Sequence, residues 1–245
     1  MLQGRTALVV GGASGIGAAI AAAFGAAGAS VVVGDRTPVP APRPALPGGP
    51  AVVGAIALDV TDEGSVAAAV AAATELVGPL DILVNSAGIL TESPLAEMSL
   101  GTWSGTLAVD LTGVFLCCRA VLPGMLARGS GRIINIASQL GIKGGIGLAH
   151  YAAAKAGVIA LTKSLALEVS SRGVLVNAIA PGPIDTPMVE GITEDWKRAK
   201  RAELPLGRFG RPEEVAPTAV LLASDPGGNL YVGQTLGPNS GDVMP

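Results

Sequence analysis

The stretch of sequence that decides the fold is residues 6–28, TALVVGGASGIGAAIAAAFGAAG. It begins with an apolar, β-branched run, Thr6–Gly11, which is typical of a buried strand. A glycine-rich turn follows, and the alanine-rich residues Gly15–Gly28 predict a helix that ends at a glycine. Glycines let the backbone approach a pyrophosphate closely, and a helix start offers unpaired amides and a positive dipole end. The junction therefore predicts a dinucleotide-binding turn, which its position favours over a plain tight turn.

Strand and helix patterns alternate along the rest of the chain. The alternation implies right-handed crossovers and an α/β fold: a Rossmann-like, doubly wound parallel sheet of about seven strands with helices on both faces. We expect a single domain over residues 1–245. Further strands are predicted at Ser30–Gly34, Ala51–Leu58, Asp81–Val84, Arg132–Ala137, Val174–Ile179 and Tyr231–Leu236. Helices are predicted from Thr61 or Asp62 to Val77 and at Gly101–Arg128, Tyr151–Arg172 and Pro212–Ser224.

The proline-rich residues 37–50 interrupt this rhythm where a short crossover helix would be expected. Each proline lacks an amide donor, so this segment is unsuited to a helix. We predict an extended, polyproline-like surface connection and favour a loop without a functional role.

Composition restricts the classes of partner. Hydrophobic residues make up 49% of the 245 residues and the net charge is −3, without a lysine or arginine cluster. These values argue against nucleic acid and against an anionic membrane surface. The two cysteines, Cys117 and Cys118, are adjacent in a predicted helix, which favours a reduced, cytoplasmic protein. No His, Cys and Asp cluster has metal-ligand spacing, so we predict no catalytic metal.

Tyr151 and Lys155 are separated by three alanines. Positions i and i+4 share one helix face, so the phenol and the ammonium are expected side by side. A free tyrosine, with a pKa of about 10, shuttles protons poorly unless a positive charge favours the phenolate. Ser138 follows the predicted strand Arg132–Ala137 and can meet the phenol. The three predict a proton-transfer site for a carbonyl or an alcohol; the alternative is an ordinary helix-start aromatic with a solvated lysine.

Asp35 closes the second strand, eighteen residues after Gly17 (35 − 17). A carboxylate there can accept hydrogen bonds from an adenosine ribose and would repel a 2′-phosphate. We therefore predict NAD as cofactor, with NADP less favoured. Arg36 complicates this prediction because a guanidinium at the next position could contact a phosphate.

The motifs together resemble those of the short-chain dehydrogenase/reductase family over essentially the whole chain. The resemblance implies that Tyr151 donates a proton to a ketone oxygen and takes it back during oxidation. It implies that Lys155 lowers the phenol pKa and binds the nicotinamide ribose, and that Ser138 holds the substrate oxygen. The motifs are the glycine turn at Gly12, Gly15 and Gly17, Asp59-Val60, Asn85-x-Ala87-Gly88, Ser138, Tyr151-x3-Lys155 and Pro181-Gly182.

The candidate site residues follow from the turn, from Asp35 and from this resemblance. The cofactor-binding set is Gly12, Ser14, Gly15, Ile16, Gly17, Asp35, Arg36, Asp59, Val60, Asn85, Ala87, Gly88, Tyr151, Lys155, Pro181, Gly182, Ile184 and Thr186. The catalytic set is Ser138, Tyr151, Lys155 and Asp110, and the substrate-binding set is Ser138, Gln139 and Tyr151.

Asp110 is a departure, because the family usually has asparagine there to hold a water in a proton relay to the lysine. An ionised aspartate is acceptor-only. One hypothesis is that Asp110 keeps the relay and adds negative charge near Lys155; the alternative is a tolerated exchange. His150, the only histidine, points away from Tyr151 by helical geometry, so we expect a packing or interface role.

The segment Thr186–Arg211 is expected to cover the substrate, as its counterpart does in the family. Trp196 either lines the pocket or, as we favour, anchors this lid. The mostly apolar composition suits a medium-sized, partly apolar ketone or secondary alcohol. The opposite wall is predicted from Gln139, Leu140, Ile142 and Lys143. Small residues on the two long helices, together with the resemblance, predict a homotetramer.

Three functions are therefore compared. The leading hypothesis is an NAD(H)-dependent oxidoreductase that interconverts a secondary alcohol and a ketone. The second is an NADPH-dependent reductase of 3-oxoacyl thioesters, carried by acyl-carrier protein or by coenzyme A. The third, a regulator that senses dinucleotide without turnover, is disfavoured because Ser138, Tyr151 and Lys155 are all present.

Overall fold

A computed structural model describes residues 1–36, 52–189, 191 and 193–244. The predicted connection at residues 37–50 lies outside this range. Seven parallel strands form one sheet in the order β3-β2-β1-β4-β5-β6-β7. The strands are β1 Thr6–Val10, β2 Ser30–Asp35, β3 Val52–Ala57, β4 Ile82–Asn85, β5 Gly131–Ile136, β6 Val174–Ile179 and β7 Thr235–Leu236. The predicted doubly wound sheet is confirmed.

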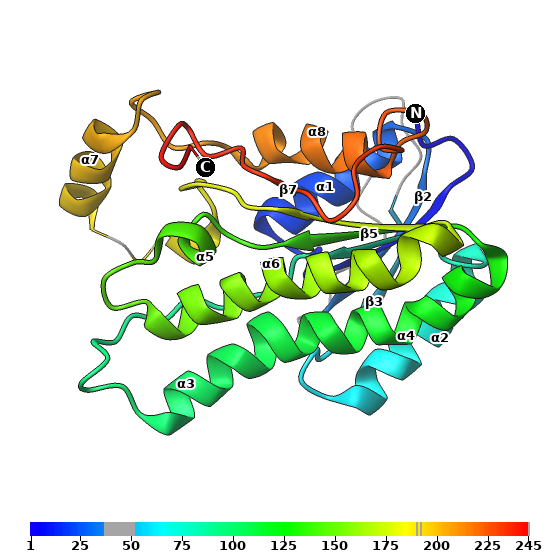
Figure 1. Cartoon of the computed structure of the whole chain (residues 1–245), viewed down its shortest axis with the longest axis horizontal. Helices are drawn as coiled ribbons and strands as arrows, with labels where there is room; N and C mark the ends of the chain where they lie inside the picture. Colours follow the sequence, from blue (N-terminus) through cyan, green and yellow to red (C-terminus); the bar gives the residue numbers. More distant parts are fainter. Residues whose placement is uncertain (37–51, 190, 192, 245) are drawn as a thin grey trace.

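Helices cover both faces of the sheet (Figure 1). One face carries α1 and α8, and the other carries α2, α4 and α6. The α-helices are α1 Gly15–Ala26, α2 Glu63–Val77, α3 Leu100–Leu107, α4 Gly113–Arg128, α5 Leu140–Lys143, α6 Ala149–Val169, α7 Glu194–Glu203 and α8 Pro212–Ala223. Shorter segments are a π-helix at Ala108–Thr112 and 3-10 turns at Ser170–Arg172 and Pro187–Val189.

Local sequence accounts for most element boundaries. Asp62 begins α2, because its carboxylate accepts a hydrogen bond of 2.6 Å from the Ser65 amide. Gly129 ends α4 with a φ of 64°, a left-handed conformation that glycine adopts without strain. Both ends lie where the sequence predicts them.

Two predicted elements need correction, and two short helices were not predicted as separate elements. The helix predicted over 101–128 is divided by the π-helical segment, which contains Asp110. The last strand is only the two residues Thr235–Leu236, because the chain bends at 232 and 233. Tyr231 and Gln234 are held to β6 by hydrogen bonds with the Asn177 side chain. The two unpredicted short helices are α5 and α7.

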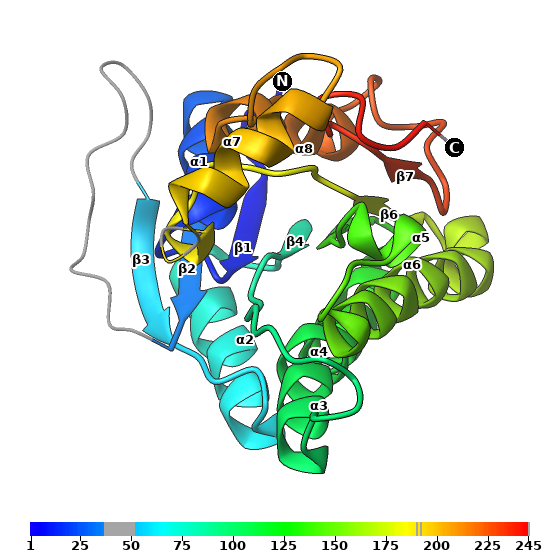
Figure 2. The same cartoon turned by 90° about the vertical axis from the view of Figure 1, so that its left-hand side faces the viewer.

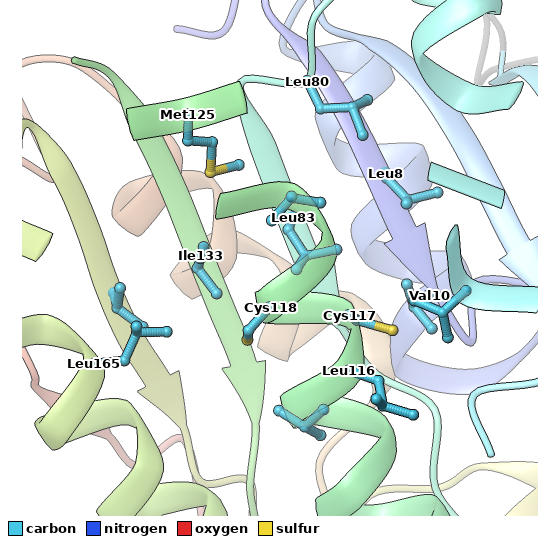
Figure 3. Close-up of a cluster of buried hydrophobic side chains, with 14 of the residues drawn as sticks. Leu8, Val10, Leu80, Leu83, Leu116, Cys117, Cys118, Met125, Ile133 and Leu165 are labelled. Atoms are coloured by element: carbon cyan, nitrogen blue, oxygen red, sulfur yellow. The ribbon is translucent and has the colours of Figure 1, made fainter. Parts of the chain in front are cut away.

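The core consists of two buried clusters, one on each face of the sheet. Figure 3 shows part of the cluster beneath α4, where Cys117 and Cys118 lie among leucine, isoleucine and valine side chains. Within the described chain, Leu100–Arg128 is the one helix long and apolar enough to cross a membrane by length and composition. Its side chains Val114, Val121 and Met125 belong to the buried cluster on that face of the sheet, so core packing accounts for part of that composition.

Strand order places the site. From β1 the chain adds β2 and then β3 on one side of β1. It then returns to add β4 and the later strands on the other side, so the strand order reverses at β1. Open α/β sheets bind ligands at such a switch point, outside the carboxyl ends of the strands. Figure 2 views the molecule at this end, with α7 and α5 nearest to it.

Candidate active site

A cavity of about 1080 Å³ opens at the carboxyl ends of the strands. Its volume matches the upper range of small-molecule and cofactor sites, about 300–1000 Å³. Eighteen of the 21 residues in the predicted catalytic, cofactor-binding and substrate-binding sets line it. They are Ser14, Gly15, Ile16, Gly17, Asp35, Arg36, Asp59, Val60, Ala87, Gly88, Ser138, Gln139, Tyr151, Lys155, Pro181, Gly182, Ile184 and Thr186.

Two glycines of the turn, Gly11 and Gly17, are too tightly packed to carry side chains. A Cβ on Gly17 would lie 2.1 Å from the Gly11 carbonyl oxygen, and a Cβ on Gly11 would lie 2.4 Å from the Ala87 nitrogen. Ser14 precedes the helix without capping it by a side-chain hydrogen bond. The first turn of α1 therefore meets the cavity as backbone with its dipole positive, and this arrangement fits a dinucleotide pyrophosphate.

Gly11 is a site residue that the sequence analysis missed. It lines the cavity with a φ of 74°. Gly12, which was also predicted to bind cofactor, does not line the cavity, and a Cβ there would lie 2.9 Å from Val33 Cγ1 of β2. Two adjacent glycines look alike in a sequence, and only the backbone path decides which of them faces the ligand.

The far end of the cavity carries the groups predicted to contact the adenosine half of the cofactor. Asp35 ends β2, and its carboxylate accepts a hydrogen bond of 3.1 Å from the Ala13 amide of the glycine turn. Asp59 accepts from the Thr61 hydroxyl at 2.7 Å and from the Thr61 amide at 2.9 Å. These bonds hold the pKa of Asp59 below its usual value.

Tyr151, Lys155 and Ser138 converge on the other end. Each side chain is nearly buried, at 8%, 4% and 8% exposure, and each lines the cavity. The Lys155 nitrogen lies 5.5 Å from the centre of the Tyr151 ring and donates to the Ile136 carbonyl at 3.1 Å. Ser138 Oγ accepts from the Leu140 amide at 3.1 Å, which leaves its own proton available for a ligand.

Asp110 lies directly behind this group. It is fully buried in the π-helical segment, with one carboxylate oxygen 3.3 Å from Lys155 Nζ and the other accepting from the Ile89 amide at 2.9 Å. Burial raises the pKa of Asp110, and the Lys155 charge opposes that rise. Burial also disfavours the Lys155 ammonium, but Tyr151 and Asp110 attract it and leave its pKa above the usual value.

Close packing explains Gly88, and Asp110 lies outside the cavity. A Cβ on Gly88 would lie 3.1 Å from the Asp110 carboxylate and 3.4 Å from Lys155 Nζ. Asp110 itself is not among the lining residues. It can therefore influence a ligand only through Lys155 and the Gly88-Ile89 backbone.

Asn85, which was predicted to pack along the cofactor, does not line the cavity. Its side chain is 2% exposed and donates to Asn135 at 2.9 Å; Asn135 in turn donates to Thr162 at 2.9 Å. These two hydrogen bonds join β4, β5 and α6 beneath the site. The Asn-x-Ala-Gly motif thus contributes Ala87 and Gly88 to the cavity and Asn85 to the core.

The remaining predicted residues divide between wall and core. His150 is fully buried, and its Nε2 lies 2.8 Å from the Thr91 hydroxyl, which is a packing role. Trp196 lines the cavity, which is the first of the two roles predicted for it, and is 49% exposed. Leu140 and Lys143 line the wall, whereas Ile142 does not.

Comparison with known proteins decides the family. The family model described as enoyl-(acyl carrier protein) reductase matches residues 11–241. The 3-oxoacyl-[acyl-carrier-protein] reductase FabG of Thermotoga maritima is 39% identical over 245 residues, covering 99% of each chain. This chain belongs to the short-chain dehydrogenase/reductase family. It is an NAD(P)-dependent oxidoreductase that acts on CH–OH donors.

Other relatives agree and differ in substrate. FabG of Vibrio cholerae is 42% identical, covering 99% of each chain. The cis-4-hydroxycyclohexanecarboxylate dehydrogenase of Sinomonas cyclohexanicum is 43% identical, covering 97% of this chain and 96% of its own. The crystal structure of gox2181 superposes with a TM-score of 0.90 at 33% identity, covering 98% of this chain and 96% of its own.

Proposed function

We propose that this member of the family is an NAD(H)-dependent dehydrogenase that interconverts a secondary alcohol and a ketone, with Tyr151 as general acid and base. The observation that carries the proposal is the placing of Tyr151, Ser138 and Lys155 on one cavity with the glycine turn. The proton donor and the predicted cofactor-binding turn then open onto the same space, as proton and hydride transfer to one carbon–oxygen bond requires.

The proposed roles follow from the hydrogen-bond state of each group. A bound nicotinamide supplies or accepts the hydride. Ser138 receives its hydrogen bond from Leu140, so its own hydroxyl proton can hold the substrate oxygen. Tyr151 delivers the proton to that oxygen during reduction and removes it during oxidation. The Lys155 ammonium attracts the negative charge that remains on the phenol oxygen.

Two cofactors fit the family, and we propose NAD. The Asp35 carboxylate lines the cavity at the end of β2, where its negative charge disfavours a 2′-phosphate. Arg36, which lines the same end, supports the alternative of an NADPH-dependent 3-oxoacyl thioester reductase. The names of the FabG relatives also favour that second candidate.

A matrix of substrates and cofactors tests this proposal. Ketones, secondary alcohols and 3-oxoacyl thioesters are each assayed with NAD(H) and NADP(H) by nicotinamide absorbance. Turnover of simple ketones or alcohols with NAD(H) supports the proposal. Turnover restricted to 3-oxoacyl thioesters with NADPH selects the second candidate, and tight dinucleotide binding without turnover selects a regulator.

We also propose a homotetramer in the cytoplasm. Phe115 on α4 and Leu167 on α6 are apolar side chains with 42% and 84% exposure, which association would cover. The two cysteines are free thiols, which suits a reducing compartment. Light scattering at micromolar concentration tests the assembly, and a monomer would contradict it.

A further inference from the structure

A carboxylate from the C-terminal segment lies between two walls of the cavity. Asp242 is 8% exposed at its side chain, with Oδ2 2.7 Å from Lys143 Nζ and Oδ1 3.0 Å from Lys200 Nζ. Lys143 ends α5, just after Ser138, and Lys200 lies on α7. Both lysines line the cavity. Figure 1 and Figure 2 show the C-terminal segment, in red, running beside α7 and α5.

Asp242 also accepts a hydrogen bond from the side-chain amide of Gln139. Gln139 follows Ser138, lines the cavity and is 3% exposed, and its backbone N–H donates to the Pro181 carbonyl at 3.0 Å. An ionised carboxylate only accepts hydrogen bonds, so it must face the NH₂ group of Gln139. Asp242 therefore fixes which way this amide points, one residue from Ser138.

The carboxylate is delivered by a folded turn. The Asn239 side chain donates to the Val243 carbonyl at 2.8 Å and accepts from the Gly241 amide at 3.0 Å. The Asp242 amide donates to the Asn239 carbonyl at 3.1 Å. Burial works against ionisation of Asp242, but hydrogen bonds from the two lysines and Gln139 keep its pKa below the usual value. The group is thus a fixed negative charge near neutral pH.

We propose that Asp242 is a positioning residue for substrate binding, which holds α7 against α5 and orients the Gln139 amide beside Ser138. The proposal rests on the function proposed above, because it assumes that the substrate binds against the cavity wall that contains Gln139, Lys143 and Lys200. Asp242 does not line the cavity, so it acts through Gln139, Lys143 and Lys200. Its loss loosens the substrate wall and leaves the glycine turn unchanged.

The chain offers a matched control on α7, the helix that carries Lys200. Asp195 pairs with Arg198 at 2.7 Å, but both side chains face solvent, with 84% and 78% exposure. Exposed pairs of this kind contribute little. Asp195→Asn therefore removes the same charge from an α7 ion pair without touching the cavity.

The test compares wild type, Asp242→Asn and Asp195→Asn in steady-state kinetics and calorimetry. For Asp242→Asn we expect the KM of the alcohol or ketone to rise about 10- to 100-fold, since small misplacements of a binding wall have effects of this size. The kcat and the dissociation constant of the dinucleotide should change little, as expected when uniform substrate binding is lost. Asp195→Asn should match wild type.

Limited proteolysis supplies a second readout that does not need turnover. α7 carries the trypsin sites Lys197, Arg198, Lys200 and Arg201. Cleavage within α7, mapped by mass spectrometry, should be at least about tenfold faster in Asp242→Asn than in wild type or Asp195→Asn, because local opening then costs less free energy. If wild type turns over no substrate, the proposed function fails, while the cleavage rates still decide whether Asp242 holds α7. An unchanged KM, or equal cleavage of Asp242→Asn and wild type, overturns the proposal.

Discussion

Replacing Asp110 by asparagine removes one charge from the buried pair behind the active site and preserves its shape. The carboxylate lies 3.3 Å from Lys155 Nζ with both side chains at most 5% exposed. Two unit charges at that separation attract by about 5 kcal/mol at an effective dielectric constant of about 20. Desolvation offsets part of this attraction, yet removing one partner leaves the other charge buried alone.

The expected cost to folding is about 3 kcal/mol, at the lower end of the roughly 3–5 kcal/mol seen when a buried pair is broken. The lower end applies because an asparagine still accepts the hydrogen bond from the Ile89 amide. For a chain of this length, about 3 kcal/mol lowers Tm by about 6–12 °C.

The pH dependence has a definite sign. Attraction to Asp110 helps to raise the pKa of Lys155, so the stabilisation exists at neutral pH and is lost as pH rises through that folded-state pKa. In Asp110→Asn the ammonium loses its proton more readily. The alkaline limb of the kcat/KM profile should therefore move to lower pH.

Thermal denaturation and pH–rate profiles measure both effects, with Asp195→Asn as the exposed-pair control. The control is expected to stay within about 0.5 kcal/mol of wild type. If Asp110→Asn kept the wild-type Tm and the wild-type alkaline limb, the carboxylate would carry no functional coupling to Lys155. The presence of aspartate at position 110, where the family usually has asparagine, would then be a tolerated difference.

Three further predictions concern the rest of the molecule. Gly17→Ala places a Cβ 2.1 Å from the Gly11 carbonyl, so it should destabilise the fold by about 1–3 kcal/mol and weaken dinucleotide binding in calorimetry; normal affinity would show that the turn yields freely. Asp35→Ser should raise kcat/KM for NADPH relative to NADH by at least about tenfold, because a like charge is removed; an unchanged ratio would place cofactor choice elsewhere. Burial raises the pKa of Cys117 and Cys118 to about 12, so iodoacetamide at mildly alkaline pH should label them only after unfolding, and mass spectrometry of the native protein would reveal any exception.

The features of the fold that were predicted from the sequence are those that depend on residues close together in the chain. The strand–helix alternation, the Asp62 cap and the ends of the central strands follow from apolar runs and capping residues. Tyr151 and Lys155 both line the cavity, as their spacing predicts, since i and i+4 share a helix face. Ser138 lines it from the carboxyl end of β5.

Features that depend on the tertiary path were not predicted. Asn85 bonds to Asn135 because β4 and β5 are neighbours in the sheet, so its polar side chain is drawn into the core. The π-helical segment around Asp110 has an ordinary helical composition, so a search for a 3.6-residue period in the sequence does not distinguish it from an α-helix. Asp242 meets Lys143 and Lys200 from far along the chain, and only the folded C-terminal turn brings them together.

One missed element did leave a local signal. α7 begins with a cap at Thr193, whose hydroxyl accepts from the Trp196 amide at 3.3 Å. Acidic residues occupy its first turn and basic residues its last, as the helix dipole favours. The helix is almost entirely polar, so a search for an apolar face passes over it.

Tyr151→Phe tests the proton-transfer account most directly, because it removes one oxygen and keeps the ring beside Lys155. Turnover and dinucleotide affinity are measured on the same preparation. The account predicts near-normal dinucleotide affinity with kcat reduced about 10²- to 10⁴-fold, the usual contribution of a positioned acid–base group. A variant that binds the dinucleotide normally and turns over at the wild-type rate would contradict it.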